Sequence, residues 1–100
     1  MSILPRDVQP YRRTDTFTPA TIPAGLLRSH ATKAGVWGLI HVLQGHLIYR
    51  VTDPRRSPLE KVLSPDQPPA VIAPEVLHEV EPVDDVRFYV EFHRAPPGGA

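Results

Sequence analysis

The 100-residue sequence has no cysteine and no net charge, because eleven basic residues balance eleven acidic ones. The absence of cysteine excludes a disulfide framework and thiolate chemistry. A neutral chain lacks the long-range field on which binding to nucleic acid or to an anionic membrane usually depends. No apolar run approaches the roughly 20 residues of a membrane span, and the N-terminus has neither the basic head nor the apolar run of a signal peptide. We therefore expect no nucleic acid and no membrane as partners, and a cytoplasmic location.

The sequence also lacks the short motifs of nucleotide use and of nucleophilic catalysis. The glycine spacings GxGxxG and GxxxxGK, whose backbone amides cradle phosphates, do not occur. None of the serines lies in an elbow motif of the kind that exposes a nucleophile. We therefore expect neither nucleotide binding nor a serine nucleophile.

Proline is abundant, with 13 residues in the chain against an average usage of about 5%. Proline removes a backbone donor and disfavours helical geometry in the preceding residue, so it frames short strands. The segment Gly35 to Val51 is rich in β-branched and aromatic residues and is split by Gln44-Gly45, which predicts a β-hairpin with its turn at that glycine. Further strands are expected at Leu59–Leu63, Ala70–Ala73, His78–Val83 and Val86–Arg94, the last two separated by a turn at Asp84-Asp85.

Short strands punctuated by proline and glycine, with no convincing helical period, predict an all-β fold in a single domain. We expect residues 1–10 to form an N-terminal arm, residues 11–94 an all-β domain, either a sandwich or a barrel, and residues 95–100 (APPGGA) a disordered tail.

Several motifs in order, from about Tyr11 to Arg94, carry a family resemblance: IPAGLLRSH, TKAGVWGLI, VLQG, YRV, APEVLHEVEP and VRFYVEF. Together they resemble the TehB/YeaR-like family of tellurite-resistance-associated small cupins. The resemblance implies a cupin-like jelly-roll β-barrel, often metal-associated, that forms a homodimer. The sequence departs from the general cupin pattern, because Gly38 stands at the glutamate position and Thr32 where a second histidine would fall.

Matched onto this chain, the resemblance implies a reduced metal site with His30 and His78 meeting at one mouth of the barrel. Glu91 is the first choice for a third ligand, with His41 and Glu81 as alternative ligands. Two imidazoles and a carboxylate suit a divalent transition metal such as Zn, Fe, Ni or Mn. The alternative is that each imidazole simply hydrogen-bonds backbone at a strand end, and that Glu91 lies on a solvated outer face.

Arg28, Trp37 and Tyr89 are expected near a pocket that takes a small-molecule ligand. Three functions remain open at this point, and with them whether the protein is an enzyme. The first is a metal-dependent enzyme acting on a small polar or oxyanionic molecule, and the second is a non-catalytic module that binds a metal or small molecule under stress. The third is a dimerising scaffold that buries the strand Val36 to Leu43, which is largely apolar on both faces.

Overall fold

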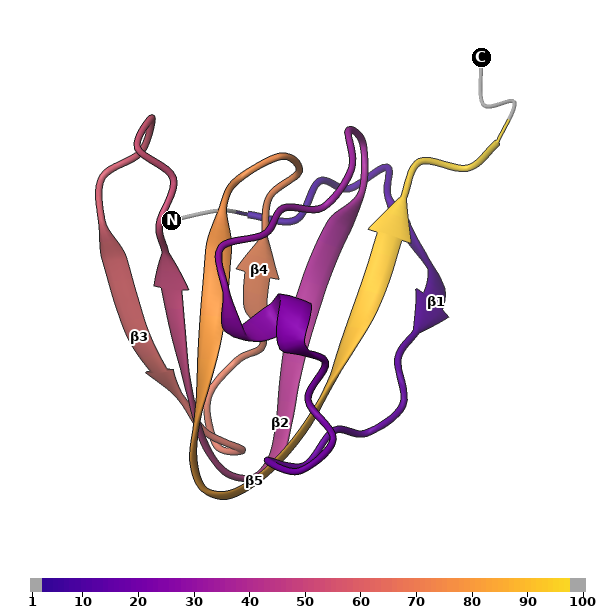
Figure 1. Ribbon diagram of the computed structural model, residues 1–100. Coiled ribbons are helices and arrows are strands. Elements are labelled where there is room, and N and C mark those ends of the chain that lie inside the picture. The colour runs from indigo at the N-terminus through magenta and orange to yellow at the C-terminus, as the bar shows by residue number, and fades with distance from the viewer. Residues whose placement is uncertain (1–2, 98–100) are drawn as a thin grey trace.

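A computed structural model of the chain describes residues 3–97. Within this range the chain forms one antiparallel sheet with strand order β1-β5-β2-β3, and β4 pairs with β2 beside this path (Figure 1). The all-β prediction is confirmed. The elements are β1 (Gln9–Arg13), the four-residue 3-10 helix η1 (Ala24–Leu27), β2 (Trp37–Val51), β3 (Leu59–Leu63), β4 (Ala70–Ile72) and β5 (His78–Arg94).

Two long strands, β2 and β5, run antiparallel along their whole length, from the pair Trp37 and His93 to the pair Val51 and His78. The register shifts on both sides of Gln44, and Figure 1 shows both strands bending sharply at the same end of the molecule. The sheet is therefore strongly curled. One half of each strand lies on one side of the curl, and the other half lies on the opposite side. β3 and β4 extend the sheet through β2, and β1 extends it through β5.

The predicted hairpin turn at Gln44-Gly45 is wrong, because β2 continues through both residues. Gly45 has a φ of 69°, and a Cβ there would lie 3.0 Å from backbone atoms of Val86. The glycine thus allows a bulge and a close approach to β5, where the sequence predicted a chain reversal. The turn expected at Asp84-Asp85 is likewise a bend inside β5, at which Asp84 takes a φ of 56°.

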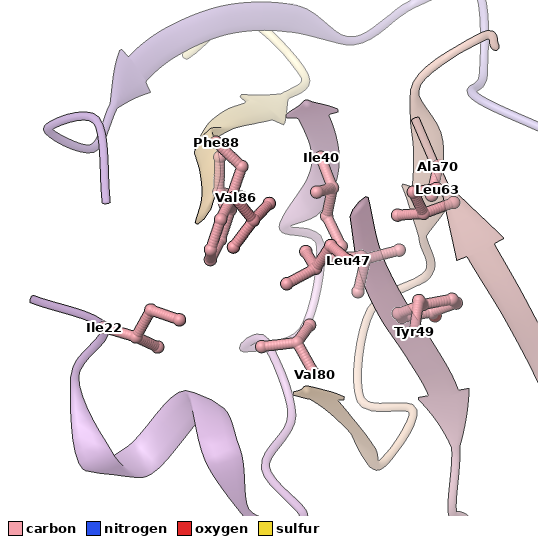
Figure 2. Packing of buried hydrophobic residues seen from close by; sticks show 11 residues of the cluster. Ile22, Ile40, Leu47, Tyr49, Leu63, Ala70, Val80, Val86 and Phe88 are labelled. Atoms are coloured by element: carbon pink, nitrogen blue, oxygen red, sulfur yellow. The ribbon is translucent and has the colours of Figure 1, made fainter. Parts of the chain in front are cut away.

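The hydrophobic core fills the concave side of this curl. Figure 2 shows Val86 and Phe88 of β5 facing Ile40 and Leu47 of β2, while Ile22 points toward them from the segment before η1. The Phe88 side chain is fully buried, and its ring meets Phe17 edge to face at a centroid distance of 5.6 Å. The buried cluster consists of Ile22, Ile40, Leu47, Tyr49, Leu63, Ala70, Ile72, Val80, Val86, Phe88 and Val90.

The sheet formed by residues 3–97 is open, so the closed cupin-like jelly-roll barrel that the resemblance implied is not what the structure shows. No helix in the described part of the chain is long and apolar enough to cross a membrane. The division into an arm, a domain and a tail stays a prediction. Residues 1–2 of the expected arm and 98–100 of the expected tail lie outside the described residues.

Candidate functional site

A cavity of about 320 Å³, here called the inner pocket, opens on the concave side of the sheet. Its floor is apolar and includes the buried side chains of Ile40, Val80 and Phe88. Leu26 of η1, which crosses in front of the sheet in Figure 1, forms part of the wall. The complete lining is Tyr11, Arg12, Thr14, Leu26, His30, Ala31, Thr32, Lys33, Val36, Ile40, Ile72, His78, Val80, Phe88, Val90 and Phe92.

His30 and His78 meet in this pocket, as the sequence predicted. Each residue donates its backbone N–H to the carbonyl of the other at 2.9 Å, and the two ring centroids lie 4.2 Å apart. His78 is only 1% exposed, and burial lowers its pKa to about 4, so its ring is neutral at pH 7. These two side chains are called the histidine pair below.

A buried carboxylate fixes the chain just before His78. Asp53 is 3% exposed and accepts hydrogen bonds from the Arg55 guanidinium at 2.7 and 2.9 Å and from the backbone N–H of Leu77 at 3.1 Å. The guanidinium bonds, together with the backbone N–H groups of Arg55 and Leu77, hold the pKa of the Asp53 carboxyl well below its usual value. The same guanidinium donates to the carbonyl of Glu75. The Asp53–Arg55 ion pair therefore fixes the orientation of the turn that precedes His78, and with it the position of His78 in the pocket.

The charged side chains of the inner pocket are cationic. Arg12 and Lys33 line it, and no aspartate or glutamate belongs to its lining among the described residues. Both cations lie in segments without periodic pattern, Arg12 in an exposed edge strand and Lys33 in the connection before β2. Sequence reasoning missed them because no spacing signal marks such positions.

Glu91 does not join the histidine pair. Because side chains alternate along a strand, Glu91 points to the opposite face from Val90 and Phe92, which line the inner pocket. On that outer face its carboxylate bonds the Nε2 of His93 at 2.7 Å and lies 3.8 Å from the Nε2 of His41. Among the described residues, the Nε2 of His41 and the Nδ1 of His93 are buried without a hydrogen bond. The outer cluster is defined as His41, Tyr89, Glu91 and His93.

The other predicted site residues also lie outside the inner pocket. Tyr89 stacks on His41 at a centroid distance of 4.7 Å, and Trp37 lies on the same outer face, paired with His93. Arg28 is exposed and contributes its backbone carbonyl to the ring of His30. Glu81 bonds Arg50 at 2.6 Å, on the face opposite His78.

A second hollow, here called the side pocket, lies between β3 and the segment before β4 and has a volume of about 530 Å³. Its charged lining is also cationic, from Arg56 and Lys61, and Tyr49 is part of the lining. No histidine belongs to its lining in the part of the chain that the structure describes. The two pockets therefore differ in one respect: of the two, the inner pocket alone is lined by imidazole side chains.

Comparison with known proteins places this chain beside TehB. A family model described as a TehB-like domain matches residues 12–90. Two curated relatives, both named probable S-adenosyl-L-methionine-dependent methyltransferase TehB, come from Haemophilus influenzae. The protein of strain ATCC 51907 / DSM 11121 / KW20 / Rd is 29% identical and that of strain 10810 is 28% identical, each over 76 residues. These matches cover 75% of this chain but only 27% of each relative, so the chain spans about a quarter of their length.

Two solved structures have the same fold. The crystal structure of TehB from Haemophilus influenzae superposes with a TM-score of 0.82 at 24% identity, over 90% of this chain and 32% of that one, and at this identity it shows the fold alone. A protein from E. coli strain K12 superposes with a TM-score of 0.83 at 26% identity, over 96% of this chain and 99% of the other. The E. coli chain is therefore nearly all accounted for by this fold.

These findings correct the metal prediction. The relatives carry the name of S-adenosyl-L-methionine-dependent methyltransferases, which conflicts with the metal-binding cupin and with its jelly-roll barrel. Within residues 3–97, no group of three or more histidine, cysteine, aspartate or glutamate side chains is placed to hold a metal ion. The predicted Zn, Fe, Ni or Mn cofactor is wrong for the same reasons, and so is the metal-dependent enzyme built on it.

Proposed function

Because the chain belongs to the family of TehB-like domains, we propose that it is a small-molecule-binding domain of a methyltransferase system and that its inner pocket takes a small organic anion. One observation carries the proposal. The pocket combines a buried apolar floor with two cationic side chains, Arg12 and Lys33, and has no carboxylate in its described lining.

The size and polarity of the pocket select the ligand class. A cavity of about 320 Å³ lies at the small end of the range typical of ligand sites, roughly 300 to 1,000 Å³. The apolar floor stabilises a ligand with hydrocarbon surface to bury, whereas an inorganic oxyanion has none. The arginine and the lysine favour a ligand with a negatively charged group. Arg12 is able to pair with a carboxylate through two N–H donors.

S-adenosyl-L-methionine itself does not fit this pocket. Its sulfonium is a cation, and the charged lining that residues 3–97 supply consists of Arg12 and Lys33, with no carboxylate to offset the sulfonium or to bind a ribose hydroxyl. The described chain also lacks a strand followed by a glycine-rich turn and a long helix, since its only helix is the four-residue η1. We therefore place methyl transfer in the part of the relatives' chains that this one does not match, and small-molecule binding in this one.

The resemblance also implied tellurite resistance, and TehB relatives agree with that association. Under this proposal the domain would hold an organic anion for the system instead of tellurite itself. The homodimer and the cytoplasmic location remain predictions.

Isothermal titration calorimetry at low salt tests the proposal with benzoate as the organic anion. Wild-type protein is expected to bind one benzoate per chain, and to bind benzyl alcohol, sodium tellurite and S-adenosyl-L-methionine more weakly. The double variant Arg12→Gln/Lys33→Gln should weaken benzoate binding about five- to tenfold, because it removes the attraction of two exposed positive charges.

The matched control is Arg56→Gln/Lys61→Gln, which removes the same two charges from the side pocket. It should leave benzoate affinity unchanged. Weakening by the control variant alone would move the site to the side pocket, and tighter binding of S-adenosyl-L-methionine than of benzoate would overturn the proposed ligand class.

A further inference from the structure

The protonation of the histidine pair follows from its hydrogen bonds. The Nδ1 of His30 lies 3.0 Å from the carbonyl of Arg28, and the Nδ1 of His78 lies 2.8 Å from the carbonyl of Val76. A carbonyl oxygen only accepts hydrogen bonds, so each Nδ1 carries the proton. In a neutral imidazole the other nitrogen, Nε2, then keeps a free lone pair.

Neither lone pair has a hydrogen-bond partner within residues 3–97. Among the described residues, no hydrogen bond reaches the Nε2 of His30 or of His78. The two threonine hydroxyls of the lining are already committed, because Thr14 donates to the carbonyl of Asp15 and Thr32 donates to that of Val36. Because both residues line the pocket and neither Nε2 is among the buried atoms without a partner, the pocket presents two accessible acceptors on its wall. A ligand donor that reaches them gains a hydrogen bond.

A metal ion is a poor match for these acceptors. Only two imidazoles are present, and the lining supplies Arg12 and Lys33 in place of the carboxylate that would complete a site. Two cations repel a divalent ion, whereas they attract the anionic end of an organic acid. A neutral O–H or N–H group satisfies an imidazole lone pair without adding positive charge.

Resting on the proposed function, we infer that the ligand is an organic acid with hydroxyl or N–H groups that donate hydrogen bonds to the Nε2 atoms of His30 and His78, while Arg12 and Lys33 hold the acid. The pocket then recognises both ends of the molecule. The histidine pair supplies specificity, because a ligand without the donor covers these acceptors and leaves them unpaired.

Calorimetric comparison of the affinities of matched ligands at pH 7.5 tests this inference. The three hydroxybenzoate isomers are compared with the three fluorobenzoate isomers, which are similar in size and charge but carry no donor. In wild-type protein the best hydroxybenzoate should bind about tenfold more tightly than its fluoro counterpart. The three positional isomers place the hydroxyl at different distances from the carboxylate, so that one of them is able to span the distance between the cationic side chains and the histidine pair.

Two variants assign the preference to the imidazoles. His30→Phe, at a partly exposed position, and His78→Phe, at a buried one, should each reduce the preference for hydroxybenzoate while retaining affinity for fluorobenzoate. Retained fluorobenzoate binding also shows that the variant is folded, and His46→Phe on the exposed bend is the matched control.

The outcomes separate this inference from the proposed function. Equal binding of hydroxy and fluoro isomers by the wild type, or a preference that survives both histidine variants, overturns the donor inference and leaves anion binding intact. Failure of every benzoate to bind overturns both. One equivalent of Zn²⁺ bound by the wild type and lost in both variants would overturn the inference in favour of a metal.

Discussion

Two groups of histidines lie on opposite faces of the same sheet and have opposite surroundings. On the outer face, the carboxylate of Glu91 bonds His93 and lies near His41. On the inner face, the rings of His30 and His78 hydrogen-bond backbone carbonyls, beside a cavity without a described carboxylate. The comparison teaches that an imidazole is available to a ligand where no acidic side chain lies beside it. The inner face meets this condition, whereas on the outer face Glu91 lies beside the imidazoles.

The largest expected difference between the faces is in packing. Phe88→Ala should lower the free energy of unfolding by about 3 to 5 kcal/mol, because the side chain is fully buried on the inner face. Leu43→Ala on the outer face, at a residue 53% exposed, should change it by less than about 0.5 kcal/mol. Urea unfolding at pH 7.5 measures both, and equal effects would contradict the assignment of the two faces.

The next effect is the pH dependence of stability from His78. Its pKa falls from the usual 6.5 to about 4 in the folded state, so below pH 6.5 the unfolded chain binds a proton that the folded chain does not. Stability is therefore expected to fall as the pH drops from about 6.5 toward 4, by about 3 kcal/mol in all.

Urea unfolding of wild type and of His78→Gln between pH 7.5 and 4.5 checks this dependence, since the variant lacks the titrating ring. The wild-type curve should fall more steeply than that of the variant. Parallel curves would mean that the His78 ring is not held neutral by burial.

The smallest effect concerns the outer cluster. Glu91→Gln removes the charge that bonds the buried His93 at 2.7 Å, which should cost about 1 kcal/mol of stability. Benzoate affinity should stay at the wild-type value, because Glu91 lies on the other face. A large loss of benzoate affinity in a folded Glu91→Gln protein would show that the two faces are not independent.

Much of the fold is readable from the sequence. The strand Leu59–Leu63 appears with the predicted bounds, and the all-β class follows from proline content and strand pattern. The hairpin at Gly45 could not be distinguished from a bulge, because both use a positive φ. The difference depends on the partner strand, where the backbone of Val86 approaches the glycine.

The site was only partly predictable. The family resemblance brought His30 and His78 together, and the structure confirms that they meet. Alternation along VRFYVEF already placed Glu91 opposite the apolar face, so its choice as a partner of the pair conflicted with the strand period. Arg12 and Lys33 reach the pocket through the path of irregular segments, which no local pattern encodes.

The most direct test of small-anion binding on the inner face is a two-dimensional ¹H–¹⁵N NMR titration of the protein with benzoate. The account predicts saturable shifts at inner-pocket amides such as Ile40, Val80 and Val90, with the amides of Lys61 and Glu91 little changed. Shifts centred on the side pocket around Lys61, or no saturable shifts, would contradict it.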